Sequence, residues 1–246
     1  MALRTRILEI GFDSITAADA VSMACEVVSS GCKTYIVTPN PEIVWIARKD
    51  NLLKDALNNA GLVLPDGVGI VLAAKILGTP LKEQVPGIDF ITLLFAELSV
   101  RGGRVFLLGA KPGIAEQAGS KLLESYPGLV IAGVADGYFS DDAHVIAEIN
   151  NASPDLLLVC LGAPKQELWM SANLGKLDVR LCAGLGGALD VFAGTVKRAP
   201  PVFRRLGLEW FYRLMKEPWR IKRMIKLPLF VFAVILSRMR GKHRLV

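Results

Sequence analysis

Short runs of apolar residues alternate along the chain with longer stretches of helical character, and most of the runs end at glycine, proline or aspartate. Short apolar runs bounded by such turn residues are typical of buried strands. We therefore expect strands at residues 34–37, 62–64, 104–108, 129–134, 156–161 and 179–182. Helices are expected at about 42–60, 68–77, 88–99, 113–125 and 142–150.

The alternation of apolar strands with helices indicates an α/β fold, with a Rossmann-like parallel sheet covered by helices on both faces. In such sheets, ligands bind at the carboxyl ends of the strands. We expect an α/β core at residues 1–196, divided into an acceptor-side half at about 1–100 and a nucleotide-binding half at about 101–196. The composition changes near Val196, and we expect a basic, helical C-terminal appendage at 197–246.

Charge is divided unevenly between these two parts. Residues 197–246 carry fourteen Lys/Arg and two acids, a net charge of +12, whereas residues 1–196 carry fifteen basic and twenty-one acidic residues, a net charge of −6. The formal charge of +6 for the whole chain therefore conceals a mildly acidic body and a strongly basic tail. A tail of this kind is attracted to an anionic lipid surface or to a polyphosphate.

An apolar run at residues 227–236 lies inside the tail, between Lys226 and Arg238. Its ten residues are about half of the roughly 20 that a helix needs to cross a bilayer. The run could lie in the membrane interface, with basic side chains reaching the headgroups, or it could be a buried core helix with a basic outer face. Because of this run we expect the tail to prefer an anionic membrane to nucleic acid. Because its basic face lacks acidic partners, we expect the tail to be mobile when no membrane is present.

Histidine and cysteine are too few and too scattered to indicate a metal site. There are two histidines, His144 and His243, and four cysteines without paired spacing. All four cysteines fall in apolar stretches, so we expect reduced, buried thiols in a cytosolic protein. The first fourteen residues contain no uninterrupted apolar stretch, so they do not resemble a secretory signal. We expect neither a metal nor a cofactor.

Glycine turns follow several of the predicted strands. Gly109 and Ala110 end one strand, and Gly137, Gly162 and Gly186 follow three others. Backbone N–H groups at such turns, where a helix begins, bind phosphate well. A single turn of this kind could equally be a tight turn that needs glycine, but several at one sheet edge indicate a nucleotide lying across it.

Polar residues next to these turns are candidates for binding this nucleotide. Asp136 and Tyr138 flank Gly137, Pro164 and Gln166 follow Gly162, and Asp190 follows Gly186. Asp190 could accept hydrogen bonds from ribose hydroxyls or a base edge, or it could be an acid favoured at a helix N-terminus. Pro164 suits a first helical turn, and Gln166 could bind a sugar or a diphosphate.

Asp66 lies between Pro65 and Gly67 at the end of a predicted strand. A carboxylate at that place could act as general base on a sugar hydroxyl, although an ordinary Asp-Gly turn is the simpler interpretation. Thr38 and Asn40 end the preceding strand. They could hydrogen-bond a sugar, or cap the helix that follows.

Three arginines of the tail share one face of a predicted helix, namely Arg213, Arg220 and Arg223. No D-x-D triplet, which many nucleotide-sugar enzymes use to hold a divalent metal, occurs in the chain. The charge of a leaving diphosphate would therefore fall to cations and backbone amides, and these arginines could supply the cations. A solvated basic face, or contact with lipid headgroups without catalysis, is the alternative.

Four stretches taken together resemble the WecG/TagA/CpsF family of bacterial glycosyltransferases. The last is long and specific, and the resemblance covers roughly residues 5–225. The stretches are Thr38-Pro39-Asn40-Pro41-Glu42, Leu64-Pro65-Asp66-Gly67, Gly162-Ala163-Pro164-Lys165-Gln166-Glu167, and the motifs from Gly186 through Asp190, Arg198-Ala199-Pro200 and Gly207-Leu208-Glu209-Trp210 to Arg213 and Arg220.

The resemblance implies a metal-independent, inverting transfer of a sugar, typically N-acetylmannosamine, from a UDP donor. It implies a polyprenyl-diphosphate-linked N-acetylglucosamine as acceptor, on the cytoplasmic face of the membrane, and a C-terminal appendage that touches the membrane. It assigns Asp66 as general base with Thr38 and Asn40 beside it, Gln166 and Asp190 to the donor site, and the tail arginines to diphosphate or lipid.

The chain departs from the family pattern at Gln84, where members often have arginine; if that arginine steadies a phosphate, this chain must compensate or use another donor. Other UDP-sugars, of the glucose or uronate type, remain alternatives. A dinucleotide-dependent oxidoreductase is disfavoured, because the turn at 109–113 is not GxGxxG. A non-enzymatic binder of membrane or nucleic acid would not need Asp66, Thr38 and Asn40 together. The sequence leaves a homo-oligomer open.

Overall fold

The computed structural model describes residues 4–205, 207–216 and 226–240. Its strands are β1 (Arg4–Ile7), β2 (Ile10–Asp13), β3 (Thr34–Val37), β4 (Leu62–Val63), β5 (Arg104–Gly109), β6 (Val130–Ala135), β7 (Leu156–Cys160) and β8 (Leu181–Gly184). Its helices are α1 (Ala17–Ser30), α2 (Pro41–Ala47), α3 (Asn51–Asn58), α4 (Val68–Leu77), α5 (Gly87–Val100), α6 (Ile114–Ser125), α7 (Asp142–Ala152), α8 (Lys165–Asn173), α9 (Ala188–Phe192), α10 (Pro201–Arg205), α11 (Glu209–Lys216) and α13 (Lys226–Met239).

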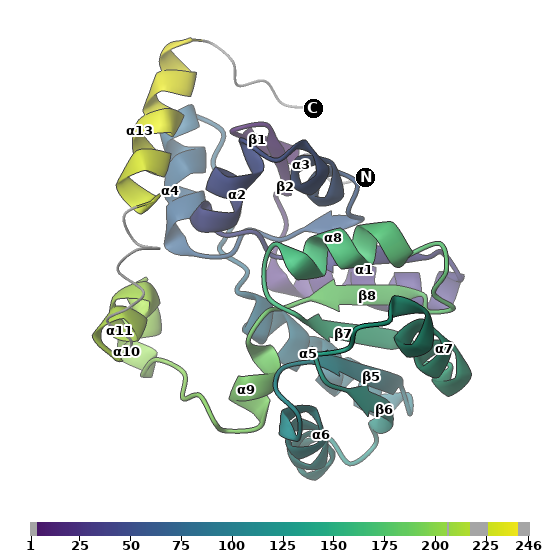
Figure 1. Ribbon diagram of the computed structural model, residues 1–246. Coiled ribbons are helices and arrows are strands. Elements are labelled where there is room, and N and C mark those ends of the chain that lie inside the picture. Colours follow the sequence, from purple (N-terminus) through teal and green to yellow (C-terminus); the bar gives the residue numbers. More distant parts are fainter. Residues whose placement is uncertain (1–3, 206, 217–225, 241–246) are drawn as a thin grey trace.

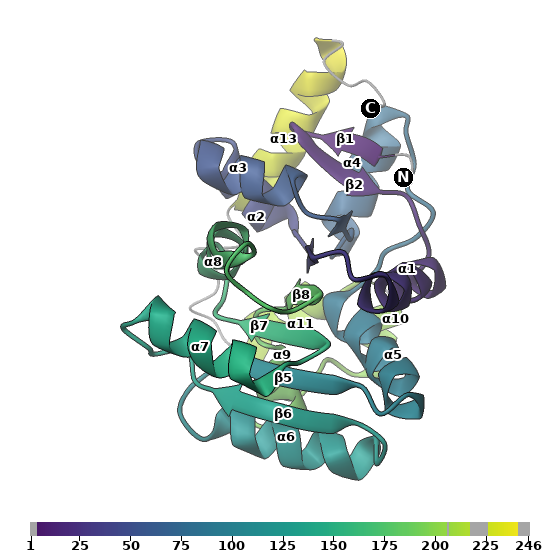
Figure 2. The same ribbon diagram turned by 90° about the vertical axis from the view of Figure 1, so that its right-hand side faces the viewer.

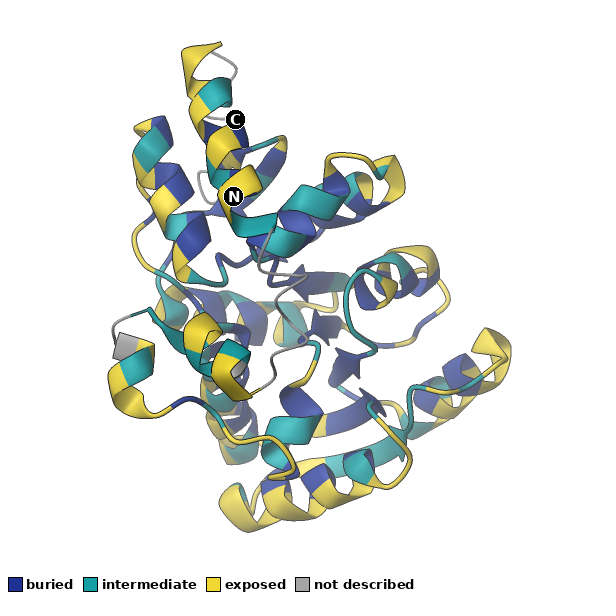
Figure 3. Cartoon of the chain, turned by 60° about the vertical axis from the view of Figure 1, so that its left-hand side comes forward, coloured by how far each residue is buried: buried dark blue, intermediate teal, exposed yellow. Residues whose placement is uncertain are grey.

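Six strands form one parallel sheet in the order β4-β3-β8-β7-β5-β6, with helices on both faces (Figures 1 and 2). Alternate residues of the central strands enter two separate cores. One core lies between the sheet and α2, α3, α4, α7, α8 and α13, and the other lies under α1, α5, α6 and α9. Figure 3 shows these buried surfaces facing inward. The predicted α/β fold with a Rossmann-like parallel sheet is confirmed.

Two of the predicted elements were wrong, and the elements before residue 34, namely β1, β2 and α1, were not predicted. The helix expected at 42–60 is two helices, because Asp50 accepts a hydrogen bond from Leu53 N at 3.0 Å and caps a new helix. The strand expected at 179–182 lies two residues later, as β8. The N-terminal hairpin β1–β2 was not predicted; Leu8 and Glu9 turn with positive φ angles of 46° and 74°, and Asp13 Oδ2 accepts from Val63 N at 2.7 Å.

Helix α13 packs against α4 and α2 (Figure 1). Phe230 and Val234 are fully buried in the first core, as the buried interpretation of this run predicts. The outer side of the same helix keeps Leu229, Phe232 and Met239 exposed. Part of the apolar surface of α4 is therefore covered by the chain's own tail helix. No helix in the described part of the chain is long and apolar enough to span a bilayer.

Candidate active site

All six strand ends meet at one edge of the sheet, because every neighbouring pair is parallel. The chain leaves β5 toward β6 on one side and leaves β7 toward β8 on the other. The crevice between β5 and β7 is thus a topological switch point, where open α/β sheets bind their ligands.

A pocket of about 470 Å³ lies at this switch point. Four predicted donor-site residues line it, namely Ala110, Gly137, Tyr138 and Asp190. The remaining lining residues were not predicted as site residues: Lys111, Phe139, Cys160, Leu161 and Lys165.

The turn after β5 requires its glycine. Gly109 has a φ of 127°, and a Cβ at this position would overlap the carbonyl oxygen of Cys160 in the neighbouring strand. Ala110 N donates to that same oxygen at 3.2 Å, and Ala110 O accepts from Gly137 N at 2.9 Å. Backbone hydrogen bonds therefore fix the turns after β5, β6 and β7 together at the floor of the pocket.

The turn after β6 carries an exposed tyrosine and, next to it, a phenylalanine ring that lies beside a cation. Asp136 Oδ1 accepts from Tyr138 N at 2.8 Å, so this carboxylate shapes the turn, and the Tyr138 side chain is exposed. Lys165 Nζ donates to Gly137 O at 3.2 Å and lies 5.0 Å from the centre of the Phe139 ring. The pocket wall therefore combines a positive charge with flat rings, which suits a nucleoside diphosphate.

Gln166 connects the turns after β7 and β8. Its side chain is buried; Oε1 accepts from Gly186 N at 2.9 Å and Nε2 donates to Glu167 Oε1 at 2.9 Å. Its backbone N–H donates to Gly162 O at 2.9 Å, and Pro164 directly precedes α8. Both polar atoms of the side chain are thus engaged within the protein, so Gln166 supports the shape of the rim.

Glu167 is a fully buried carboxyl group beneath this rim. Burial raises its pKa above the ordinary value of 4.5, against the lowering effect of the hydrogen bond from Gln166. Its Oε2 has no hydrogen-bond partner among the described residues. Since the folded state binds the proton more tightly than the unfolded state, stability falls as pH rises from 4.5 through the raised pKa, and the cost persists above it.

The variant Glu167→Gln is expected to remove that pH-dependent cost. Its melting temperature should match that of the wild type near pH 4 and exceed it at pH 8, by about 2–4 °C for each kcal/mol relieved in a chain of this size. Thermal denaturation between pH 4 and pH 9 measures this, with the exposed Glu124→Gln as control. Parallel pH curves for Glu167→Gln and the wild type would contradict the buried charge.

Asp190 lies in the first turn of α9, half-buried at the pocket. Its Oδ1 is 3.5 Å from Thr195 Oγ1, and its backbone carbonyl accepts from Thr195 N. Gly186, with a φ of 48°, makes the preceding turn. The structure therefore places Asp190 in the same pocket as Ala110 and Gly137.

The three predicted catalytic residues leave two neighbouring strands at the same edge. Thr38, almost fully buried, donates from Oγ1 to Gly184 O at 3.5 Å. Asn40 Oδ1 accepts from the backbone N–H groups of residues 42 and 43 at 3.0 and 3.1 Å, so it caps α2 and keeps only Nδ2 for a ligand. Asp66 is half-buried in the turn after β4, which pairs with β3.

The stretch that contains Gln84 borders both of these turns. Val85 N donates to Pro65 O at 2.9 Å, next to Asp66. A Cβ at Gly87 would lie 3.2 Å from Thr38 Oγ1. The departure from the family pattern at Gln84 is therefore beside the candidate base and not in the pocket at β5 and β7.

The predicted tail arginines are not placed at the site. Arg220 and Arg223 lie outside the described residues, as does the side chain of Arg213. Gly207 of the appendage does pack against Val68, two residues after the candidate base, because a Cβ at Gly207 would lie 3.2 Å from Val68 Cβ. Arg198 Nη1 also pairs with Asp89 Oδ1 at 2.7 Å, near the N-terminus of α5.

Two lysines of the pocket were missed by the sequence reasoning although their positions carried a signal. Lys111 follows the glycine turn of β5, and Lys165 follows Gly162-Ala163-Pro164. A cation directly after a strand-end turn is well placed to meet phosphate. Phe139 and Leu161 carried no comparable signal, since apolar residues at a strand end fit packing equally well.

The described residues include no group of three or more His, Cys, Asp or Glu side chains that could hold a metal ion. Cys25, Cys160 and Cys182 are buried, and burial raises the pKa of Cys160 and Cys182 to about 12. The expectation of four buried thiols was wrong for Cys32, which is exposed in the loop after α1.

Several known transferases of one name have sequences similar to this chain. The chain is 40% identical over 200 residues to N-acetylglucosaminyldiphosphoundecaprenol N-acetyl-beta-D-mannosaminyltransferase of Bacillus subtilis, covering 81% of this chain and 78% of that protein. The protein of the same name from Bacillus spizizenii is 38% identical over 201 residues, covering 82% and 78%. The Staphylococcus aureus protein of that name (strain MRSA252) is 34% identical over 239 residues, covering 96% and 94%.

The sequence profile of one family extends over almost the whole chain. The glycosyl transferase WecG/TagA/CpsF family matches residues 5–244, which include the turns of the candidate site and the C-terminal appendage. With this match and relatives of 34–40% identity over most of the chain, the protein belongs to the WecG/TagA/CpsF family of glycosyltransferases.

Proposed function

We propose that the protein transfers N-acetylmannosamine from UDP to a polyprenyl-diphosphate-linked N-acetylglucosamine, with inversion and without metal or cofactor, in the synthesis of a cell-surface polysaccharide or teichoic acid. Membership of the glycosyltransferase family and the names of the relatives support this activity. The structural observation that carries it is the meeting of two sets of residues at one sheet edge: the pocket at β5 and β7, and the turns bearing Thr38 and Asp66.

The donor occupies the pocket at the switch point. Lys111 and Lys165 face the diphosphate, Tyr138 lies against the flat uracil or the ribose, and Asp190 accepts from ribose hydroxyls. Strand β8 lies between β7 and β3, so the sugar of the donor extends from the pocket toward Thr38. The tail arginines Arg213, Arg220 and Arg223 contact the leaving diphosphate or the lipid.

Asp66 serves as the general base. Its carboxylate takes the proton from an acceptor hydroxyl, whose oxygen attacks the anomeric carbon of the donor sugar on the face opposite to UDP. The bond from that carbon to the diphosphate breaks, and UDP leaves. Attack on the opposite face inverts the configuration, which agrees with the β linkage in the names of the relatives.

The acceptor is held by a lipid, so the enzyme must work at a membrane surface. The net charge of +12 in residues 197–246 and the exposed apolar side chains of α13 favour peripheral attachment to an anionic membrane, at its cytoplasmic face. No role for nucleic acid is proposed. A homo-oligomer stays a prediction, and sedimentation analysis of the full chain tests it.

The test is UDP release from a panel of UDP-sugars in EDTA, with and without a lipid-diphosphate-linked N-acetylglucosamine. Release from UDP-N-acetylmannosamine that requires the acceptor and persists in EDTA is the expected result. Preferential use of a glucose- or uronate-type donor would identify another UDP-sugar. Release that EDTA abolishes would contradict the metal-independent mechanism, and stabilisation by NAD(P) in place of UDP would favour an oxidoreductase.

A further inference from the structure

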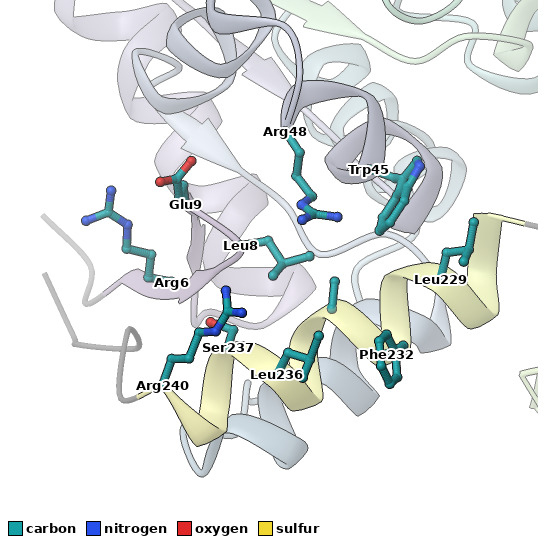
Figure 4. A pocket seen from close by; sticks show the side chains of 11 residues that line it. Arg6, Leu8, Glu9, Trp45, Arg48, Leu229, Phe232, Leu236, Ser237 and Arg240 are labelled. Carbon is teal, nitrogen blue, oxygen red and sulfur yellow. The ribbon is translucent and has the colours of Figure 1, made fainter.

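A second concave site lies away from the candidate active site, between α13, α2 and the β1–β2 hairpin (Figure 4). Its volume is about 820 Å³, which is within the usual range for sites that bind small molecules. We call it the tail groove and define it by the residues that face it: Arg6, Leu8, Trp45, Arg48, Phe232 and Arg240, with Leu229 and Leu236 on α13.

The tail groove is polar at one end and apolar at the other. Arg6 and Arg240 lie at the end formed by the hairpin and the C-terminus of α13, and Arg48 and Arg240 point toward Leu8 from opposite sides (Figure 4). Glu9, the carboxylate at this end, accepts from Lys54 Nζ at 2.7 Å. The cations of the groove therefore outnumber its acids.

The opposite end is formed by Trp45, Leu229 and Phe232 (Figure 4). Leu229 is 46% and Phe232 is 61% exposed, so apolar area is open to solvent there. At 1.5 Å per residue, Leu229 and Arg240 are about 16 Å apart along the chain of α13. That length is close to half of the roughly 30 Å hydrocarbon core of a bilayer, which is the depth of one leaflet.

We propose that the tail groove binds one anionic phospholipid, with its phosphate between Arg48 and Arg240 and an acyl chain along Trp45, Leu229 and Phe232. The charge at one end and the apolar strip at the other complement the two parts of such a lipid. This inference rests on the proposed attachment to an anionic membrane and adds to it a defined site for a single lipid.

The orientation of the groove separates this lipid from the acceptor. Helix α2 begins directly after its cap Asn40, which follows β3 next to the strand that carries the candidate base, and Arg48 follows the other end of the helix, about 12 Å farther along. The first residue of α13, Lys226, pairs with Glu42 at 3.1 Å, so the apolar end of the groove is the end nearer the active site. An acceptor lying in the groove would have its diphosphate at the wrong end, away from Asp66.

Occupation of the groove would also stabilise the contact of α13 with α2. Arg48 lies 4.5 Å from the centre of the Trp45 ring, so a phosphate bound to Arg48 and an acyl chain on Trp45 act on the same helix. Asn40 caps that helix at its other end. A lipid in the groove therefore bridges the appendage and the helix that carries a candidate site residue.

The experiment is calorimetric titration of the full chain with dihexanoyl-phosphatidylglycerol, below the concentration at which it forms micelles. Saturable binding to one site is expected, at least fivefold tighter than binding of dihexanoyl-phosphatidylcholine. Arg48→Gln should weaken the binding about fivefold, and Phe232→Ser should weaken it as well. Both side chains are exposed, so these variants should fold, which circular dichroism checks.

The matched control is Lys49→Gln, which removes the same charge from the exposed neighbour of Arg48 outside the groove. Equal losses for Lys49→Gln and Arg48→Gln, or equal affinities for the two lipids, would overturn the proposal. Glycerol phosphate binding as tightly as the lipid would show a phosphate site only, and tighter, Arg48-dependent binding of farnesyl diphosphate would assign the groove to the acceptor. A chain that floats with phosphatidylglycerol vesicles but shows no saturable binding would keep the proposed attachment and reject the groove.

Discussion

Asp66→Asn is expected to lower the turnover number about 10²–10⁴-fold, the usual contribution of a general base, while the affinity for UDP stays unchanged. The amide has the shape of the carboxylate but cannot take a proton from the acceptor hydroxyl. The donor pocket is formed at the carboxyl ends of β5, β6 and β7. Asp66 follows β4, which is the outermost strand of the sheet and is separated from β7 by β3 and β8. The substitution should therefore separate catalysis from donor binding.

The measurements are the rate of acceptor-dependent UDP release and the dissociation constant of UDP by calorimetry. Asp55→Asn makes the same chemical change at an exposed position on α3 and should retain full activity. A turnover number of Asp66→Asn equal to that of the wild type would contradict the role of Asp66 as general base. A loss of UDP affinity as large as the loss of turnover would mean that Asp66 shapes the donor site instead.

The sheet could be predicted from the sequence because its central strands are buried on both faces and read as continuous apolar runs. The hairpin could not, since Arg4–Ile7 and Ile10–Asp13 are short and mix polar with apolar residues. Its position depends on a tertiary contact, the hydrogen bond from Val63 N to Asp13. The break between α2 and α3 was missed for a related reason, because one capping side chain interrupts an otherwise helical pattern.

The turns at the edge of the sheet could be predicted where backbone geometry demands particular residues. Gly109, Gly137 and Gly186 follow strands at one edge, and this edge can be inferred from the alternation of strands and helices alone. The hydrogen bond of Gln166 could not be predicted from the sequence, because its partner Gly186 is 20 residues away and only the folded chain brings the two together. The same holds for Lys165, whose contact with Gly137 O depends on how β6 and β7 are arranged about β5.

The charge of the tail and the packing of its helix α13 describe two different properties of the same segment. Its basic composition indicates a membrane surface, and on that basis mobility was expected when no membrane is present. The structure adds that one side of α13 is core, with Phe230 and Val234 fully buried, whereas Phe232 on the other side is exposed. Apolar packing on α2 and α4 thus fixes the position of the helix, and thereby the positions of its basic side chains.

Phe230→Ala is expected to detach α13 from the core. Deleting a buried phenylalanine side chain costs about 3–5 kcal/mol, through lost apolar burial and the cavity that remains. A single helix held by one apolar face has few other contacts to offset that cost, so the loss should appear as local opening before the sheet unfolds. Limited trypsin digestion measures it, because Lys226, now paired with Glu42 at 3.1 Å, and Arg238, which donates to Ile76 O at 2.7 Å, become cleavable.

Phe232→Ala is the matched control. It removes the same kind of side chain two residues farther along the helix, where the phenylalanine is 61% exposed. It should leave the digestion rate close to that of the wild type. Rapid cleavage of the wild-type chain at Lys226, as fast as in Phe230→Ala, would contradict the docking of α13 in the absence of a membrane. Slow cleavage of the wild type with fast cleavage of Phe230→Ala alone would show that the buried face of the tail helix, and not its charge, holds it beside α2.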